Sequence, residues 1–303
     1  MRINESFQLR QISTMKIGGA AEKILSAKTF LNSRVELPRP IRILGNGSNT
    51  LIDDHGLKGS VILTRNDVRE NSDPMILDET PRECVIAVSA GYNLPALARW
   101  SVKRGWTGCE YMIGIPGTLG GALVQNAGAN EQELSEILVS AKTFNLEEHQ
   151  SLQLSKEECA LGYRTSRFKT LDDPKQLLLI DSVTLRLKRA EKNIDLEKLL
   201  ERNLQYRKTQ TPYSKPSLGS VFTRLRDDKG QWLYPGKLIE ECGLKGHKIG
   251  GASVSHIHAN YIVNNGDATF DDVLRLIEQI ERTVFNKTGV RMRREIVIWS
   301  DRI

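Results

Sequence analysis

The chain has 303 residues, of which 26% are charged and 39% hydrophobic, and it carries a formal net charge of +6. This length is sufficient for two hydrophobic cores and favours two or three domains. The positive charge is spread along the chain and only 6% of the residues are aromatic, which argues against a nucleic-acid-binding face. We therefore expect small-molecule ligands and no nucleic-acid partner.

Hydropathy and cysteine spacing indicate in which cellular compartment the protein is expected to act. No apolar run approaches the length of a membrane span, and residues 1–5 do not begin a secretory signal. Cys84, Cys109, Cys159 and Cys242 are far apart and form neither a C-x-x-C motif nor a metal-ligand pattern with histidine. Such cysteines are expected to be buried free thiols in a reducing environment. The sequence thus predicts a cytoplasmic protein with no membrane span and no metal site.

The first part of the chain is predicted to mix short strands with one clear helix. Strands are expected at 41–44, 84–88 and 183–187 from their apolar or alternating patterns. Asn93 is placed to cap a helix that Gly105 ends. Residues 66–83 are polar and are expected to form an exposed excursion.

The last third of the chain is predicted to form a smaller unit. A domain boundary is expected between about residues 188 and 215, where an amphipathic segment gives way to prolines. A helix is expected at 236–242, and another at 270–287 that begins with a near capping box. Strands are expected at 262–264 and 296–298. The pattern indicates an α+β fold.

The densest glycine cluster is at 116–128, where four glycines and a proline fall within thirteen residues. Glycine is unfavourable inside helices and strands, so this density predicts a backbone that closely approaches a ligand. After the proline, Gly117 and Thr118 suit the first turn of a short helix, whose free N–H groups attract phosphate. A tight structural turn is the alternative. The candidate cofactor-binding residues here are Gly117, Thr118, Gly120, Gly121, Asn126, Ala127 and Gly128.

A second glycine-rich turn follows the strand at 41–44. It lacks the third glycine of a dinucleotide-binding fingerprint, and residues 51–52 resemble a strand and not a helix. The turn is therefore predicted to supply backbone amides and small polar side chains to a pyrophosphate outside a Rossmann unit. The candidate residues are Gly45, Asn46, Gly47, Ser48 and Asn49.

Further motifs accompany the two glycine clusters in a fixed order. They are at 14–19, 44–49, 114–122, 125–129, 162–169, 216–222, 238–246, 249–252, 258–260 and 289–295. This set resembles the UDP-N-acetylenolpyruvoylglucosamine reductase (MurB) family of bacterial cell-wall synthesis, in its shorter class. The resemblance implies a FAD-binding region of the vanillyl-alcohol-oxidase (PCMH) type with two subdomains in residues 1–195. It also implies a smaller α+β substrate-binding domain in residues 205–303.

The resemblance also implies an activity and its residues. The family reduces UDP-N-acetylglucosamine enolpyruvate to UDP-N-acetylmuramate with NADPH and non-covalent FAD. In this sequence Ser220 matches the family's proton donor, and Arg164 and Glu295 match the pair that stabilises the enolate. Tyr163 and Arg224 are the expected substrate-binding residues. Hydride addition builds charge on an enolate-like carboxylate, which requires cations or hydrogen-bond donors and a proton source.

Local sequence alone favours plainer roles for the same residues: a turn for Ser220, a surface pair for Tyr163 and Arg164, and a strand edge for Glu295. Two departures from the family pattern stand out. Arg293 replaces an acidic neighbour of Glu295 and would lower the pKa of that carboxyl if the two were close. Arg224 stands in the motif that usually reads Lys-Asn, and it is expected to meet a diphosphate.

Two rival functions remain open at this point. One is an FAD-dependent alcohol oxidase or dehydrogenase of the same fold, and the other is a non-catalytic flavin-binding protein. The presence of Ser220, Arg164 and Glu295 together argues against the binding protein, since binding alone needs none of them.

Overall fold

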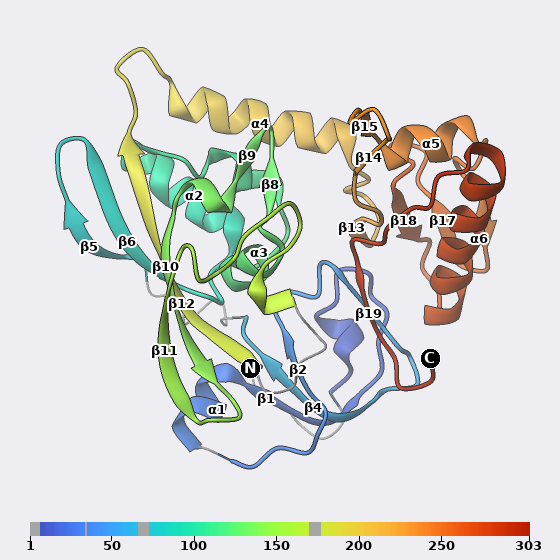
Figure 1. Ribbon diagram of the computed structural model, residues 1–303, viewed down its shortest axis with the longest axis horizontal. Coiled ribbons are helices and arrows are strands. Elements are labelled where there is room, and N and C mark those ends of the chain that lie inside the picture. Colours follow the sequence, from blue (N-terminus) through green and yellow to red (C-terminus); the bar gives the residue numbers. More distant parts are fainter. Residues whose placement is uncertain (1–6, 34, 66–72, 170–176) are drawn as a thin grey trace.

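The computed structural model describes residues 7–33, 35–65, 73–169 and 177–303 (Figure 1). The expected absence of a signal at residues 1–5 lies outside these ranges, and so does the part of the predicted excursion at 66–72. The fold is α+β, as predicted, and the three larger sheets each have their own strand order.

The first sheet is parallel and lies at the bottom of Figure 1, with strand order β1-β4-β2. Apolar side chains of β4, such as Val61 and Ile62, are fully buried on both faces, as is typical of a parallel strand. The elements here are η1 (Leu9–Gln11), β1 (Ala21–Ser26), α1 (Ala27–Ser33), β2 (Ile41–Leu44), β3 (Thr50–Ile52) and β4 (Leu57–Leu63).

The largest sheet is antiparallel, with strand order β11-β10-β12-β6-β5 and β7 paired with β12. Its strands are β5 (Met75–Glu79), β6 (Glu83–Ser89), β7 (Trp106–Thr107), β10 (Leu138–Asn145), β11 (Gln150–Ser155) and β12 (Leu178–Arg189). The strands predicted at 84–88 and 183–187 are confirmed as β6 and β12. The excursion predicted at 66–83 is wrong for residues 75–79, because their backbone pairs with β6 although every side chain is exposed.

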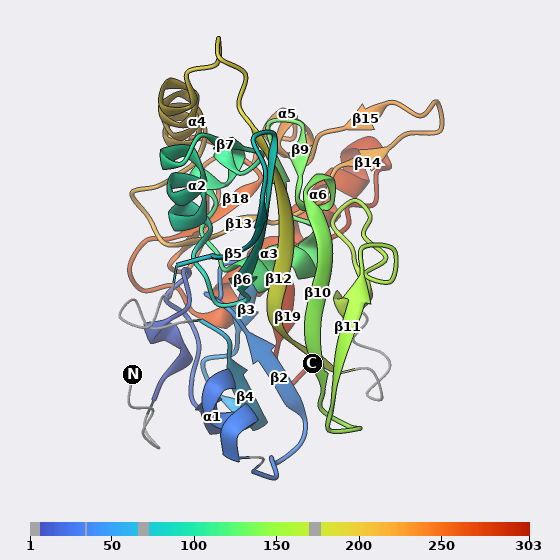
Figure 2. The same ribbon diagram turned by 90° about the vertical axis from the view of Figure 1, so that its left-hand side faces the viewer.

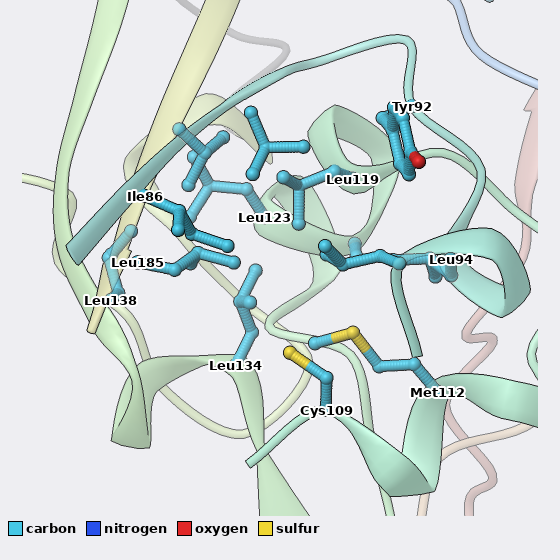
Figure 3. Packing of buried hydrophobic residues seen from close by; sticks show 14 of the residues in the cluster. Ile86, Tyr92, Leu94, Cys109, Met112, Leu119, Leu123, Leu134, Leu138 and Leu185 are labelled. Atoms are coloured by element: carbon cyan, nitrogen blue, oxygen red, sulfur yellow. The ribbon is translucent and has the colours of Figure 1, made fainter. Parts of the chain in front are cut away.

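Helices cover one face of this sheet. The elements are α2 (Leu94–Lys103), η2 (Glu110–Gly114), α3 (Leu119–Gln125), β8 (Gly128–Ala129), β9 (Gln132–Glu133), η3 (Leu134–Glu136) and η4 (Arg167–Lys169). Figure 3 shows Ile86 and Leu185 of the sheet facing Leu119 and Leu123 of α3. The predicted cap is confirmed, because the side chain of Asn93 accepts a hydrogen bond from the Ala96 amide at 3.2 Å.

The C-terminal part is built on a second antiparallel sheet, of order β13-β18-β17-β16. Its strands are β13 (Ser217–Ser220), β16 (Lys248–Ile249), β17 (Ala252–Val254) and β18 (Tyr261–Asn264). The hairpin β14 (Leu225–Arg226) and β15 (Trp232–Leu233) and the helices α5 (Pro235–Glu241) and α6 (Phe270–Thr288) complete it. The capping box predicted for α6 is confirmed, with Thr269 and Asp272 each bonded to the other's backbone.

Helix α4 (Leu196–Gln210) crosses the top of Figure 1 and joins the two parts. Its last turn is anchored to the segment before the glycine-rich turn at 117–121. Arg207 Nε and the Tyr213 hydroxyl both donate to the Gly114 carbonyl, at 3.2 and 2.8 Å. The helix spans the predicted junction between 195 and 205, so the domain limits stay a prediction.

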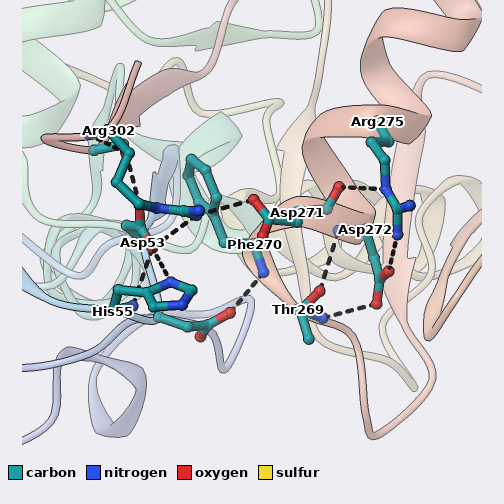
Figure 4. A network of polar contacts seen from close by, with 10 residues as sticks. Asp53, His55, Thr269, Phe270, Asp271, Asp272, Arg275 and Arg302 are labelled. Atoms are coloured by element: carbon teal, nitrogen blue, oxygen red, sulfur yellow. Dashed lines mark hydrogen bonds and ion pairs between the residues drawn. The ribbon is translucent and has the colours of Figure 1, made fainter.

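The last strand returns to the first part of the chain. β19 (Val297–Trp299) leaves the C-terminal part and pairs in parallel with β3, with Ile298 opposite Leu51. Beyond it, Arg302 donates to the buried Asp53 at 2.7 Å and to Asp271 at 2.9 Å (Figure 4). Since Asp271 belongs to α6, this arginine connects both parts of the chain.

Hydrogen bonds from neighbouring side chains keep the buried Asp53 carboxyl ionised. Its side chain is 1% exposed, and burial alone would raise its pKa. Hydrogen bonds from Arg302, Ser300 and His55 outweigh this effect and hold the pKa well below its ordinary value. A carboxyl with a lowered folded-state pKa contributes stability above its unfolded pKa, and this contribution is lost as pH falls.

We predict that Arg302→Ala lowers the free energy of unfolding at neutral pH, because Asp53 is left buried with fewer donors. The difference from the wild type should shrink as pH falls below about 4. Denaturant unfolding measures both effects. Lys198→Ala, which breaks an exposed pair with Asp195, should cost less than about 0.5 kcal/mol. Equal losses in the two variants would contradict the role given to Arg302.

Candidate active site

The two glycine-rich turns meet in space. A Cβ atom on Gly45 would lie 2.7 Å from Thr118 Oγ1, and one on Gly117 would lie 3.5 Å from Ser48 Oγ. Gly47 has a φ of +58°, which disfavours any residue with a side chain. The turn after β2 and the turn before α3 therefore lie side by side, and their binding of FAD stays a prediction.

The turn after β2 presents free donors. In the described ranges, no protein acceptor takes the amide hydrogens of Asn46, Gly47 and Ser48. Consecutive free amides of this kind form a concave anion-binding nest. The nest and the glycine opposite it fit the pyrophosphate of a dinucleotide such as FAD.

Thr118 and Gly120 have structural roles beside these turns. Helix α3 begins at Leu119, so Gly117 and Thr118 precede the helix and do not form its first turn, and the Thr118 side chain caps it by accepting from Gly121 N at 3.3 Å. Gly120 N donates to Ala90 O at 2.7 Å, and a Cβ at 120 would lie 2.9 Å from Ala90 Cβ. Gly120 is therefore required for packing against β6.

Asn126 organises the segment that follows α3. It is 1% exposed and has a φ of +41°. Its Nδ2 donates to Glu133 Oε2 at 2.8 Å and to the Gly162 carbonyl at 3.1 Å, while its Oδ1 accepts from Ser135 N. These bonds hold residues 126–128 against the loop that carries Arg164.

Arg164 and Glu295 form an ion pair, although they lie far apart in the sequence. Arg164 Nε is 3.0 Å from Glu295 Oε1, and the two side chains are 18% and 16% exposed. Arg164 also donates to the carbonyls of Asn126 at 3.3 Å and Gly128 at 3.1 Å. Its own φ of +53° is strained for a non-glycine residue. The guanidinium is thus held in one orientation by several contacts.

The backbone of Glu295 connects the serine strand with the first glycine turn. Its amide donates to the Val221 carbonyl at 2.7 Å, next to Ser220. Its carbonyl accepts from Asn49 Nδ2 at 3.1 Å. The placement of this carboxyl therefore depends on both parts of the chain at once.

Burial raises the pKa of Glu295 above its ordinary value, although the Arg164 and Lys169 charges oppose this. Arg293 was expected to lower this pKa only if it lay close to Glu295, and it is not among the cations that act on the carboxyl, which are Arg164, Lys169 and Arg224. Sequence reasoning missed Lys169, whose Nζ donates to Gln125 Oε1 at 2.9 Å and to the Arg164 carbonyl at 3.0 Å. Its place at the end of the 162–169 motif was the available signal.

A cleft of about 960 Å³ brings the predicted residues together. Ser220, Arg164 and Glu295 all line it, and so do Tyr163 and Arg224. Ser220 ends β13 directly after Gly219, whose φ is +78°. The lining residues that were not predicted include Tyr234, Lys237, His258 and Asn260. Of these, only His258 and Asn260 lie in a motif that the sequence had singled out.

Two family models match the chain. Residues 27–147 match an FAD binding domain, and residues 211–299 match the C-terminal domain of UDP-N-acetylenolpyruvoylglucosamine reductase. Reductases of that name from Synechococcus sp. (strain JA-3-3Ab) and Bacillus velezensis are 37% and 35% identical to the chain. The alignments cover 98% of this chain and 91% and 94% of those proteins. The chain belongs to this reductase family.

A solved structure agrees with this membership. The crystal structure of UDP-N-acetylenolpyruvylglucosamine reductase from Thermus caldophilus matches with a TM-score of 0.77 and 29% identity, covering 97% of this chain and 98% of that one. The protein is thus an FAD-dependent oxidoreductase with an FAD-binding domain of the vanillyl-alcohol-oxidase type. In the described ranges, no helix is long and apolar enough to cross a membrane.

We predict that Gly117→Ala weakens FAD binding by about tenfold or more, because the methyl group would occupy space on the ligand side of the turn. Among the described residues, the nearest neighbours of this methyl group would be Ser48 Oγ at 3.5 Å and Leu94 Cδ1 at 3.6 Å, so the fold should be retained. Titration of apoprotein with FAD measures the affinity, and thermal unfolding of apoprotein measures stability.

Gly120→Val is the matched comparison. It should lose stability as well as flavin, because its side chain would overlap Ala90. A Gly117→Ala protein that binds FAD as tightly as the wild type would remove Gly117 from the cofactor site.

Proposed function

We propose that the protein reduces the enolpyruvyl ether of UDP-N-acetylglucosamine to UDP-N-acetylmuramate, with NADPH as the reductant, in peptidoglycan precursor synthesis. The observation that carries this proposal is the convergence of Ser220, Arg164 and Glu295 on one cleft in a full-length member of the reductase family. NADPH and the UDP-sugar are its small-molecule partners.

FAD would be held non-covalently by the two glycine-rich turns. The free amides of Asn46, Gly47 and Ser48 suit its pyrophosphate, and Gly45 and Gly117 leave room for close approach. When bound there, FAD would supply the hydride chemistry between NADPH and the methylene carbon of the enolpyruvyl group. Every other requirement of the reaction falls to side chains of the chain itself.

Arg164 would stabilise the negative charge that builds on the substrate carboxylate. Its guanidinium is fixed in orientation by two carbonyls and Glu295, so little reorganisation is needed as the charge develops. Glu295 has a raised pKa through burial, which favours its neutral form. A neutral carboxyl donates a hydrogen bond to the enolate where a carboxylate would repel it.

Ser220 would deliver the proton to the neighbouring carbon. A serine hydroxyl is a weak acid in water, but an enolate carbon is a strong base, so transfer is feasible when the two are held together. Ser220 lines the same cleft as Arg164 and Glu295. The proton leaves Oγ as the carbon–hydrogen bond forms, and the hydroxyl is then restored from solvent.

Arg224 is proposed to contact the substrate's diphosphate, with Tyr163 beside it in the cleft. The four cysteines are buried and free, which supports a reducing compartment, and we propose that the enzyme acts in the cytoplasm. An alcohol oxidase of the same fold would instead need a base for its substrate's hydroxyl proton, whereas in this cleft the Glu295 carboxyl is paired with the Arg164 guanidinium at 3.0 Å.

The direct test is anaerobic mixing of the purified protein with NADPH and then with UDP-N-acetylglucosamine enolpyruvate. Loss of flavin absorbance with NADPH and its return with the enolpyruvyl substrate are expected. Bleaching by an alcohol and not by NADPH would favour the oxidase. If neither NADPH nor an alcohol bleached the flavin, a non-catalytic binding protein would be favoured.

We predict that Ser220→Ala is reduced by NADPH at nearly the wild-type rate but is reoxidised by the enolpyruvyl substrate about 10²–10⁴ times more slowly. The hydroxyl is needed only when the enolate takes up its proton. Stopped-flow absorbance separates the two half-reactions. Equal impairment of both halves would indicate that Ser220 positions ligands, and two normal halves would require another proton donor.

We predict that reoxidation in the wild type slows as pH rises through the raised pKa of Glu295, because the donor form is lost. Each pH unit above that pKa should cost up to about tenfold. Glu295→Gln stays neutral at every pH and should lack this dependence, whatever its absolute rate. Parallel pH profiles for the two proteins would contradict the role of Glu295 as a neutral donor.

A further inference from the structure

The hairpin β14–β15 carries a cluster of arginine and aromatic side chains at the edge of the cleft. Arg224, just before β14, donates from Nε to the Tyr163 hydroxyl at 3.1 Å. Its guanidinium lies 5.1 Å from the centre of the Tyr163 ring and 4.8 Å from the Trp232 ring. The two rings are themselves 5.7 Å apart. Arg224 thus contacts two neighbouring aromatic side chains that come from distant segments.

Trp232 is in turn held by the hairpin. Arg226 is its cross-strand partner, and the Arg226 guanidinium lies 4.0 Å from the centre of the Trp232 ring. Figure 2 shows that the hairpin projects from the C-terminal part of the molecule. Among the described residues, Tyr163 and Arg224 line the cleft whereas Trp232 and Arg226 do not. Any effect of Trp232 on a ligand must therefore pass through Arg224 or Tyr163.

Among the described residues, Arg224 lines the cleft without forming an ion pair. Three cations line the cleft within the described ranges: Arg164, Arg224 and Lys237. Arg164 pairs with Glu295 at 3.0 Å and Lys237 pairs with Glu241 at 3.8 Å. The close contacts of Arg224 are with the rings of Tyr163 and Trp232, and its charge also lowers the pKa of Glu295. The Tyr163 hydrogen bond raises the pKa of Arg224 itself. Of these three, Arg224 is the one lining cation whose charge is available to an anionic ligand without first breaking an ion pair.

An exposed arginine ordinarily samples many side-chain conformations, and binding an anion must then restrict them. The aromatic contacts on Arg224 impose this restriction before a ligand arrives. Arginine is well suited to such a site, since its flat guanidinium stacks on rings and still offers donors at its edge.

We propose that Trp232 is a positioning residue that holds Arg224 in the cleft for the diphosphate of the nucleotide substrate. This inference rests on the proposed function and adds to it the residue that prepares the anion site. It also gives the departure at Thr223-Arg224 a physical basis, because arginine gains from the aromatic contacts in a way that lysine would not.

The test measures binding of UDP to the oxidised holoenzyme by titration calorimetry. Trp232→Ala should raise the dissociation constant by about tenfold, and Trp232→Phe should restore most of the affinity because a ring is retained. In an Arg224→Ala background, Trp232→Ala should have little further effect, as expected when one residue acts through the other. Uridine, which lacks the diphosphate, should bind the wild type and Trp232→Ala equally.

Controls separate positioning from folding. Tyr206→Ala removes an exposed aromatic from α4 and should not change UDP binding. Flavin absorbance and thermal stability should match the wild type in every variant. The role of Trp232 would be overturned if Trp232→Ala bound UDP as tightly as the wild type. It would also be overturned if Trp232→Ala weakened UDP binding equally with and without Arg224. Neither result would affect the proposed substrate. Absence of UDP binding by the wild type would overturn the nucleotide substrate and this inference together.

Discussion

The parallel pairing of β19 with β3 is the constraint on which the rest of the structure depends. It returns the end of the chain to the first part, so that Glu295 lies between Val221 on one side and Asn49 on the other. Arg302 then bonds to the buried Asp53 and to Asp271 of α6. Thr14 Oγ1 also donates to the Ser217 carbonyl at 2.7 Å, so the return of the chain and this contact together fix the serine strand beside the first glycine-rich turn.

Opposing electrostatic effects meet in that cleft. Burial favours the neutral form of Glu295, whereas the adjacent Arg164 favours the ionised form. Burial has the larger effect, so the pKa of Glu295 is raised, whereas the pKa of a carboxyl in a surface ion pair is ordinarily lowered. Arg164 keeps its orientation through the Asn126 and Gly128 carbonyls even if Glu295 is neutral. The pair can therefore combine a fixed positive charge with a neutral donor, which suits a developing enolate.

The hairpin β14–β15 illustrates how a local change in sequence is accommodated. The family resemblance implied Lys-Asn where this chain has Thr223-Arg224, and the Arg224 guanidinium lies beside two rings, 5.1 Å from the centre of Tyr163 and 4.8 Å from that of Trp232. Tyr163 also lies 5.1 Å from the Arg164 guanidinium, so the same ring contacts both arginines. Arg164 and Arg224 thus share one aromatic neighbour, and a variant at Tyr163 would change the surroundings of both guanidinium groups.

The sequence by itself determined the local elements and the family. The Asn93 cap, the α6 capping box and the glycine-rich turns depend on a few adjacent residues, and the order of motifs indicated the reductase family. Tertiary structure decided the remainder: the pairing of exposed β5, the packing role of Gly120, the direction of the Glu295 pKa and the contacts of Lys169 and Trp232. Each of these depends on burial or on a distant partner, and neither is encoded in neighbouring residues.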